Sequence, residues 1–272
     1  MSALQEKTRR LQEEIKNASP LIVAYSGGVD SAYLAYAAHR ALGGRMLAVT
    51  ALSASFSSRD RAMAEATAQQ FSFPHEFIET EELSNPEYRA NNPNRCFFCK
   101  DELFTKLDEL AARQGFNAVA YGVNTDDRGD WRPGERAARK HRVLTPLVDC
   151  GLGKADIRTL AREAGLPVWD RPASACLASR IAYGLEVTPE RLSVIEKAEE
   201  SVRSLGFRQF RVRHHGNLAR LEVAPEEMAR ALDVEMARRF AEIFRSLGFA
   251  YATIDLDGYR RGSLNTGIRG RN

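Results

Sequence analysis

The sequence predicts an α/β protein in which helices cover a parallel sheet, followed by a smaller C-terminal α+β domain. Short apolar segments alternate with helical patterns through most of the chain before Thr188. Strands that alternate with helices form βαβ units, in which the strands are parallel and the crossovers right-handed. After Thr188 the pattern changes, and two alternating segments lie close enough in sequence to pair as a hairpin.

Several elements justify the parallel sheet. The first helix carries Leu4, Leu11 and Ile15 on one face. Leu21-Ile-Val-Ala-Tyr25 is a continuous apolar run, as is typical of a strand buried on both sides. The other strands are expected at 46–51, 75–78 and 118–121, and the other helices at 30–42, 59–70, 101–114 and 154–164.

A second domain is expected after a connection at 169–186 that is rich in Pro, Ser, Ala and Gly. Thr188-Pro189 is typical of an N-cap followed by proline at the first helical position. The elements expected there are a helix at 189–205, strands at 207–212 and 218–223, a helix at 235–247 and a strand at 251–256. The domains are therefore 1–186, 187–257 and a basic tail at 258–272, which we expect to be solvated rather than a binding arm.

Length and composition are those of a folded, soluble protein. The 272 residues include 44% hydrophobic and 28% charged residues, which argues against disorder. A net charge of +3 does not suit a protein that coats a polyanion. The charged N-terminal segment has no apolar core, and no apolar run approaches the ~20 residues of a membrane span. With four cysteines and no secretory signal, we expect a reduced, cytoplasmic setting.

A glycine-rich turn joins the first apolar strand to the next helix and reads Ser26-Gly-Gly-Val-Asp-Ser31. Successive glycines let the backbone approach an anion, and the N–H groups at the start of the helix favour phosphate. It is not a Walker A loop. Gly153-Lys154 imitates the end of that motif, but Val148 stands where its first glycine belongs. The dinucleotide-binding glycine pattern is also absent, and a turn without a ligand is the alternative.

This turn, after an apolar strand, resembles the signature of the PP-loop ATP pyrophosphatases. Those enzymes cleave ATP between its α and β phosphates, adenylate a substrate oxygen and let a nucleophile displace AMP. The resemblance implies a Rossmann-like sheet of the adenine nucleotide alpha hydrolase type, with ATP and Mg²⁺ bound at its carboxyl edge. The residues that it assigns to ATP or its pyrophosphate are Ser26, Gly27, Gly28, Val29, Asp30, Ser31, Thr50, Gly122 and Asp126. Among these, Asp30 would bind Mg²⁺ and Thr50 would lie near adenine.

Three of the four cysteines lie in two motifs. Cys96 and Cys99 have CxxC spacing, and Cys176 lies in a Ser-Ala-Cys-Leu-Ala segment. Haem attachment would require histidine where Lys100 stands, and the CxxC pair does not open a helix after a strand as a thioredoxin motif does. Cys150 is most simply a small buried residue.

Two metal centres fit these three cysteines. A structural zinc ion needs four ligands, so zinc would require Cys96, Cys99, Cys176 and a histidine such as His141. Three thiolates with one open corner suit a [4Fe–4S] cluster, whose remaining iron is then free to carry sulfur.

In combination, the motifs resemble the LarE family over residues 14–257. They are SGGVDS, NPNRCFFCK, PASACLASR, the segment 181–188 and RVRHHGNLARLEV, in this order. LarE enzymes adenylate a carboxylate of pyridinium-3,5-biscarboxylic acid mononucleotide and convert it to a thiocarboxylate for the nickel-pincer cofactor of lactate racemase. Some members sacrifice the sulfur of a cysteine matching Cys176, whereas others carry three cysteines and are thought to use a [4Fe–4S] cluster. Cys96 and Cys99 place this chain with the second kind, and a sacrificial Cys176 is the alternative.

Charge suggests how the substrate nucleotide would be held. Arg211 and Arg213 alternate on a strand and face one side, where the arginine fork suits the substrate phosphate. Two arginines on a solvated strand face are the alternative. By the resemblance, Arg180 would offset charge as AMP leaves and Ser179 would hydrogen-bond the reacting carboxylate beside Cys176.

The roles of four neighbouring residues stay open. Either Glu199 or Glu200 orients an arginine, or both are simply exposed. His214 and His215 are adjacent on a strand and face opposite sides, which argues against joint metal ligation.

The sequence therefore predicts a cytoplasmic ATP-dependent sulfurtransferase that acts on a small nucleotide and takes sulfur from a sulfide donor. Its expected cofactors are ATP, Mg²⁺ and a [4Fe–4S] cluster, and the resemblance implies a homo-oligomer such as a hexamer. A tRNA thiolase is the second hypothesis, although no additional RNA-binding domain is evident and no stable nucleic-acid or membrane partner is expected. A synthetase without sulfur chemistry leaves the cysteines unexplained, and a non-catalytic binding module would release no pyrophosphate.

Overall fold

The computed structural model describes residues 2–127, 133–172, 175–260 and 262–265, and the chain divides into two compact units. Unit 1 comprises Met1–Glu82 and Cys96–Ser174, and unit 2 comprises Leu83–Arg95 and Ala175–Asn272. The expected boundary after residue 186 thus lies within unit 2. One reason is a backbone hydrogen bond from Val187 to the Arg89 carbonyl (2.8 Å), which joins the two parts of this unit.

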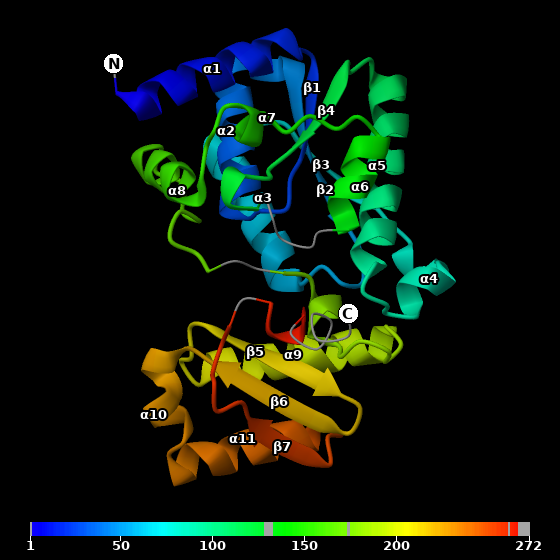
Figure 1. Ribbon diagram of the computed structural model, residues 1–272, viewed down its shortest axis with the longest axis vertical. Helices are drawn as coiled ribbons and strands as arrows, with labels where there is room; N and C mark the ends of the chain where they lie inside the picture. The colour runs from blue at the N-terminus through cyan, green and yellow to red at the C-terminus, as the bar shows by residue number, and fades with distance from the viewer. Residues whose placement is uncertain (1, 128–132, 173–174, 261, 266–272) are drawn as a thin grey trace. The chain divides into compact units, whose positions relative to one another are not determined.

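A parallel sheet of four strands, in the order β3-β2-β1-β4, forms the centre of unit 1 (Figure 1). The strands are β1 (Leu21–Ala24), β2 (Met46–Leu52), β3 (His75–Glu79) and β4 (Ala118–Tyr121). Each lies within one residue of its expected ends. The predicted α/β class with a parallel sheet is confirmed.

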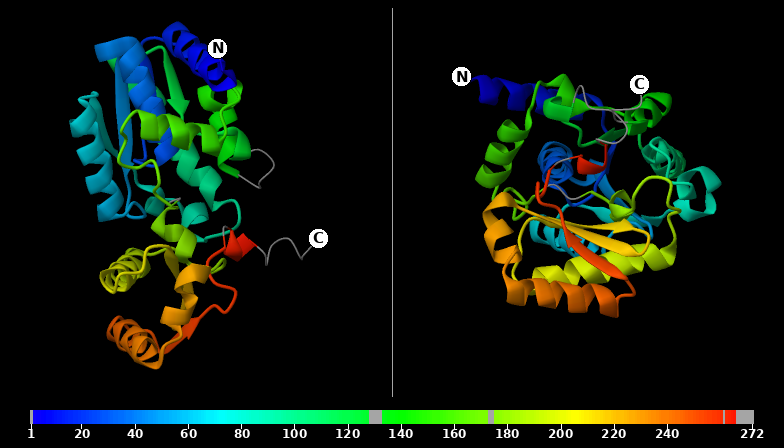
Figure 2. Two further views of the ribbon diagram at one scale, coloured as in Figure 1. Left: turned by 90° about the vertical axis from the view of Figure 1, so that its left-hand side faces the viewer. Right: turned by 60° about the horizontal axis from the view of Figure 1, so that its bottom comes forward.

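Helices cover both faces of this sheet (Figures 1 and 2). They are α1 (Ala3–Asn17), α2 (Val29–Leu42), α3 (Ser58–Phe71), α5 (Arg95–Gln114), α6 (Pro133–Lys140), α7 (Pro146–Asp149) and α8 (Lys154–Glu163). On β1, Leu21 and Val23 join a core with α1, α2 and α8, whereas Ile22 and Ala24 join a second core with α5 and α6. Because both sides of the strand are buried, its sequence is a continuous apolar run.

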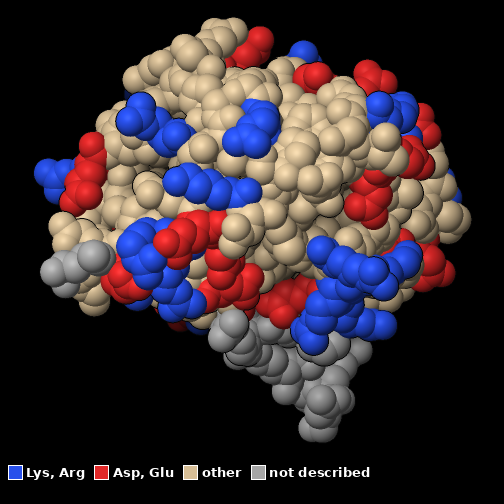
Figure 3. All heavy atoms as spheres, turned by 90° about the horizontal axis from the view of Figure 1, so that it is seen from above, with Lys and Arg blue, Asp and Glu red and all other residues tan. Residues whose placement is uncertain are grey.

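Helix α5 begins at Arg95, earlier than the expected Asp101, so the CxxC motif lies in its first turns. Helices α6 and α7 were not predicted. None of the described helices combines the length and the apolar character that crossing a membrane requires. On the face seen in Figure 3, Lys and Arg side chains lie beside Asp and Glu side chains.

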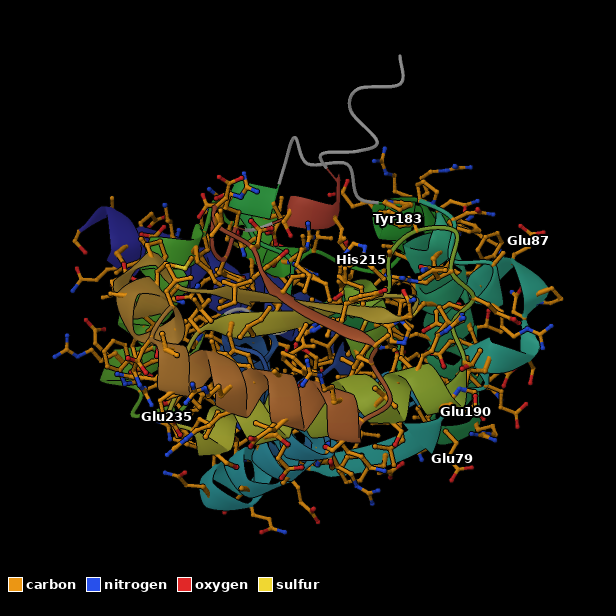
Figure 4. The ribbon with its side chains drawn as sticks, turned by 90° about the horizontal axis from the view of Figure 1, so that it is seen from below. Glu79, Glu87, Tyr183, Glu190, His215 and Glu235 are labelled. Carbon is orange, nitrogen blue, oxygen red and sulfur yellow. The ribbon has the colours of Figure 1, made fainter. Side chains whose placement is uncertain are left out.

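Unit 2 contains a sheet of three strands in the order β5-β6-β7. Its elements are α4 (Pro86–Arg89), α9 (Pro189–Ser204), β5 (Phe210–His215), β6 (Leu218–Val223), α10 (Met228–Ala231), α11 (Val234–Ser246) and β7 (Tyr251–Ile254). Strands β5 and β6 are antiparallel, and β7 runs parallel to β6. One face packs on α9 and α11 (Figure 2), which begin with Glu190 and Glu235 in their first turns, where the helix dipole favours acidic groups (Figure 4).

Strand β5 starts at Phe210 rather than at the expected residue 207. Gly206 (φ 89°) follows the end of α9 in a left-handed conformation, and the chain takes three more residues to reach the strand. Arg211 and Arg213 still alternate along β5 and share its face away from the helices, because Phe210 and Val212 point into the core.

In the described part of the expected tail, Gly258, Tyr259 and Ser263 pack on the rest of unit 2, which differs from the expected solvated arm. The Tyr259 N–H donates to the Val223 carbonyl at 2.7 Å, and Ser263 is buried. A Cβ at Gly258 would lie 2.8 Å from the Val223 oxygen, so this approach requires glycine. Residues 261 and 266–272 of the expected tail lie outside the described residues.

Candidate functional site

The glycine-rich turn lies at the carboxyl end of β1, where α2 begins. Gly27 (φ 72°) approaches α3 so closely that a Cβ on it would lie 3.0 Å from the Ala64 Cβ. The Ser31 hydroxyl accepts the Ser26 N–H at 3.2 Å and donates to the Gly28 carbonyl at 3.0 Å. Gly28 is the N-cap residue and has no side chain to cap α2. The first N–H groups of the helix are therefore available to an anion such as phosphate.

Gly122, the residue after β4, lies very close to the backbone of this turn. A Cβ on Gly122 would lie 2.6 Å from the Ser31 nitrogen and 2.8 Å from its Cα. Only glycine fits such an approach between two backbones. The structure thus brings the later loop that follows β4 next to the glycine-rich turn.

We expect Gly122→Ala to lower the free energy of unfolding by about 1–3 kcal/mol, because the new methyl group forces the β4 loop and the start of α2 apart. Chemical denaturation of the variant and the wild type measures the difference. Gly44→Ala is the matched control, since a Cβ at Gly44 meets nothing within 4 Å. Equal stability of both variants would show that the loop moves away without cost.

Lys154, at the start of α8, connects the two loops. Its Nζ lies 2.5 Å from the Asp30 Oδ2, and its backbone N–H donates to the Asp126 Oδ2 at 2.7 Å. The Asp30 Oδ1 is buried and has no hydrogen-bond partner within the described residues. A carboxylate oxygen left open next to a phosphate-binding turn fits Mg²⁺, which takes one or two carboxylates together with substrate phosphates. Asp126, by contrast, caps α8.

Thr50 is held inside the sheet rather than at its edge. Its hydroxyl donates to the Tyr25 carbonyl at 2.6 Å and lies 2.8 Å from the His75 Nε2. Burial lowers the pKa of His75, which favours a neutral ring as the partner. The Thr50 side chain thus links β2 to the residue after β1 and to β3. A contact with adenine here would therefore be made by the backbone at the end of β2.

Cys96 and Cys99 lie one helical turn apart at the start of α5, and residues at this spacing share a helix face. Cys96 is exposed and Cys99 is half-buried. The Cys99 thiol donates to the Glu82 Oε1 at 3.5 Å, and burial raises the pKa of this carboxyl group. In the described part of the chain, no group of three or more His, Cys, Asp or Glu side chains is placed to hold a metal ion.

His141, the candidate zinc ligand, already uses both ring nitrogens. Its Nδ1 lies 2.7 Å from the Asp108 Oδ2, and its Nε2 lies 3.0 Å from the Asp101 Oδ1. A zinc site with this histidine would have to break one of these contacts, so the structure does not favour the zinc alternative.

Cys176 stands directly before a short 3₁₀ turn, Leu177–Arg180, in unit 2. Its carbonyl accepts hydrogen bonds from the Ser179 N–H (2.9 Å), the Ser179 hydroxyl (2.7 Å) and the Arg180 guanidinium (3.0 Å). Three donors on one carbonyl fix the backbone at Cys176. The Ser179 hydroxyl would have to leave this carbonyl to reach a substrate carboxylate.

Arg180 is buried and forms a bidentate ion pair with Glu199: its Nε donates to Oε1 at 2.9 Å and its Nη2 to Oε2 at 3.1 Å. Glu199 also accepts the Val212 N–H at 3.2 Å, at the edge of β5. The question left open by the sequence is thereby answered: Glu199 orients an arginine, whereas Glu200 is exposed.

The turn after Cys176 is braced by residues from the other part of unit 2. The Arg95 guanidinium donates to the Ala178 carbonyl at 2.8 Å and to the Asn91 side chain. The Asn91 amide in turn donates to the Ala182 carbonyl at 2.9 Å. Arg95 and Asn91 thus hold this turn from the segment Leu83–Arg95 of the same unit.

Arg213 is 6% exposed, so the alternative of a solvated arginine face is wrong. Its guanidinium donates to the Ser179 carbonyl (3.0 Å), to Glu222 (2.9 Å) and to the Ser263 hydroxyl (2.9 Å). Arg211 is half-buried, and burial together with nearby Arg180 lowers its pKa. Glu222 and Ser263 were not predicted as site residues.

His214 and His215 end β5 on opposite sides of the strand. The His214 ring packs against Phe249, with centroids 5.1 Å apart. His215, which is labelled in Figure 4, shares a side of the strand with Arg211 and Arg213, because alternate strand residues face the same side. Burial lowers the pKa of both rings.

Comparisons with known proteins place the chain among relatives of similar length. It is 33% identical over 267 residues to the pyridinium-3,5-bisthiocarboxylic acid mononucleotide synthase of Lactiplantibacillus plantarum, which covers 97% of this chain and 96% of that protein. It is 41% identical over 262 residues to an uncharacterized protein of a Synechocystis species, covering 96% and 98%. A subunit of the glutamine-hydrolyzing GMP synthase of Pyrococcus furiosus is 26% identical over 232 residues, covering 75% and 70%. No protein-family model matches the chain.

Proposed function

Because the chain belongs to the family of the pyridinium-3,5-bisthiocarboxylic acid mononucleotide synthases, the LarE family, we propose that it inserts sulfur into a carboxylate of pyridinium-3,5-biscarboxylic acid mononucleotide. The product is the thiocarboxylate needed for the nickel-pincer cofactor of lactate racemase. The observation that carries the proposal is the glycine-rich turn with Asp30 and Lys154, in a chain that also holds the CxxC pair and Cys176.

The first step is adenylation. A substrate carboxylate oxygen attacks the α-phosphorus of ATP, the bond from that phosphorus to the bridging oxygen breaks, and pyrophosphate leaves. The uncapped start of α2 binds the pyrophosphate, and Asp30 holds Mg²⁺ through the oxygen that lacks a partner in the described residues. Lys154 supplies a positive charge next to the leaving group.

The second step replaces AMP. A sulfur nucleophile attacks the carboxyl carbon, and AMP leaves with the oxygen through which it was attached. In unit 2, the ion pair with Glu199 fixes Arg180, whose Nη1 donates a hydrogen bond to the Cys176 carbonyl. It can therefore offset the negative charge that develops there without reorganising. Arg211 and Arg213 hold the substrate phosphate.

The sulfur source that we propose is a [4Fe–4S] cluster held by Cys96, Cys99 and Cys176. The donor set fits, since thiolates are the usual ligands and two of them lie one helical turn apart. When bound, the cluster supplies an iron without a protein ligand that accepts external sulfide. The sulfide donor and the homo-oligomer stay predictions.

The test of this function is a product analysis under anaerobic conditions with the dicarboxylated nucleotide, ATP, Mg²⁺ and sulfide. We expect AMP and pyrophosphate in equal amounts, together with a nucleotide in which sulfur has replaced one oxygen, detected by mass spectrometry. A pyridinium nucleotide without carboxylates is the control and should yield neither AMP nor pyrophosphate. Formation of ADP and phosphate would contradict the PP-loop mechanism.

A further inference from the structure

The chain after β7 crosses the face of the unit 2 sheet that carries the arginines. We call residues 255–260 and 262–265 the C-terminal strap. The Asp255 N–H donates to the Leu221 carbonyl at 2.8 Å, and the Tyr259 N–H donates to the Val223 carbonyl, so the strap is attached along β6. The Tyr259 ring packs under the Arg211 guanidinium, at 5.1 Å from its centroid. The strap therefore lies directly on the proposed phosphate site.

Ser263, at the far end of the strap, inserts its hydroxyl between two buried charges. It accepts a hydrogen bond from the Arg213 Nη2 at 2.9 Å and donates one to the Glu222 Oε1 at 2.7 Å. Glu222 is completely buried and also accepts from Arg220 at 3.2 Å. A serine in this position can transfer its donated hydrogen bond to any anion that reaches Arg213.

Two observations indicate that this part of unit 2 is built to receive an anion. Arg180, Arg211 and Arg213 gather here: burial lowers the pKa of the Arg211 guanidinium, and the positive charges of Arg180 and Arg213 lower it further. In addition, the Arg213 Nε is buried and lacks a hydrogen-bond partner among the residues that the structure describes. A phosphate group would both offset the gathered positive charge and accept from this open buried donor.

We propose that Ser263 is a specificity-determining residue of the substrate site: its hydroxyl turns from Glu222 to the phosphate of the nucleotide, and the strap closes on that phosphate. This inference rests on the proposed function, because it takes the ligand of Arg211 and Arg213 to be a nucleotide monophosphate. The strap thereby distinguishes the nucleotide from the corresponding nucleoside, which lacks the phosphate that Ser263 contacts.

The test compares binding of the dicarboxylated pyridinium nucleotide with binding of its dephosphorylated nucleoside. We expect Ser263→Ala to weaken nucleotide binding about tenfold, the effect of losing one hydrogen bond to a charged group, and to leave nucleoside binding unchanged. Ser263→Thr keeps the hydroxyl and should bind the nucleotide nearly as the wild type does. Ser246→Ala is the matched control, because the Ser246 hydroxyl donates to the Ile243 carbonyl at the exposed end of α11.

The outcomes separate this inference from the proposed function. If wild-type protein binds nucleotide and nucleoside equally, the phosphate role of Arg211 and Arg213 is wrong. If the wild type discriminates and Ser263→Ala retains the same discrimination, only the strap inference is wrong. Hydrogen exchange of the wild type provides a readout independent of any variant. Amides of the strap should exchange more slowly with the nucleotide than with the nucleoside, and equal exchange would overturn the inference.

Discussion

Replacing Cys176 with alanine is expected to reduce sulfur transfer to background and to abolish the broad visible absorbance of an iron–sulfur cluster. Cys96→Ala and Cys99→Ala should have the same two effects, because a cluster with only two thiolate ligands from the protein is not retained. The measurements are iron and sulfide content, an optical spectrum of anaerobically purified protein, and thiocarboxylate formation. The absorbance reports the cluster independently of activity.

Cys150→Ala is the matched control for these variants. Cys150 is buried in the core beneath α1 and α2, and burial raises the pKa of its thiol to about 11. A neutral, enclosed thiol neither ligates iron nor attacks an activated carbon. We therefore expect this variant to keep both the absorbance and the sulfur transfer.

Mass spectrometry of the intact protein after turnover distinguishes the two sulfur routes. A sacrificial Cys176 would lose the mass of H₂S and become dehydroalanine after one event, whereas external sulfide permits repeated turnover. We expect no loss of mass. Dehydroalanine at position 176, with full activity in iron-free protein, would contradict the cluster and restore the sacrificial route. Activity in Cys96→Ala and Cys99→Ala would lead to the same conclusion.

The α/β class and most of the sheet were predictable because the local sequence and the tertiary environment agree. Residues 118–121 were predicted as a strand with the ends that β4 has. Alternate residues of β1 enter different cores, so every position has to be apolar, and such a run is visible without knowledge of its partners. The glycine-rich turn was equally visible, because its requirement for glycine is a local property of the backbone.

The contacts of the site side chains were less predictable, because they depend on distant pairings. Asp30 and Lys154 are far apart in sequence, and in sequence Gly153-Lys154 is no more than an incomplete Walker A motif. The β5–β6 register sets Arg213 opposite Arg220. Glu222 is two residues further along β6, so it is the diagonal neighbour of Arg213 and can accept its hydrogen bond. A register is fixed by the hairpin as a whole, and neither residue reveals it alone. Ser263 has no sequence signal at all.

The two compact units differ from the predicted domain division for a similar reason. Residues 83–95 precede the CxxC motif and fall within the predicted N-terminal domain, yet they belong to unit 2. Asn91, in a left-handed conformation with φ 53°, donates its side-chain amide to the carbonyls of Ala182 and Leu185. One short segment thus supplies hydrogen bonds to a loop that follows much later in the chain. Neither composition nor periodicity indicates such an exchange.

Asp30→Ala should lower the rate of pyrophosphate formation by about a hundred- to a thousandfold, the usual effect of removing one preorganised charge from a transition state. The Asp30 Oδ2 lies 2.5 Å from the Lys154 Nζ, and the buried Oδ1 is the oxygen that we assign to Mg²⁺. Asp101→Ala is the matched control, since it removes an aspartate–lysine pair of unit 1 that lies outside the glycine-rich turn, with Lys140 at 2.8 Å. Thermal unfolding of both variants shows whether lost activity reflects lost structure.

A double-mutant cycle with Lys154→Met decides what the lysine contributes. If Lys154 merely neutralises Asp30, removing it from the Asp30→Ala protein should change nothing further. If it stabilises the departing pyrophosphate, as we propose, the double variant should be slower than Asp30→Ala, because the two side chains then act on different charges. The Mg²⁺ dependence separates the roles a second time. Asp30→Ala should require a higher Mg²⁺ concentration for half-maximal rate, whereas Lys154→Met should keep the wild-type requirement and lose rate at every Mg²⁺ concentration. An unchanged Mg²⁺ requirement in Asp30→Ala would remove Asp30 from the metal site.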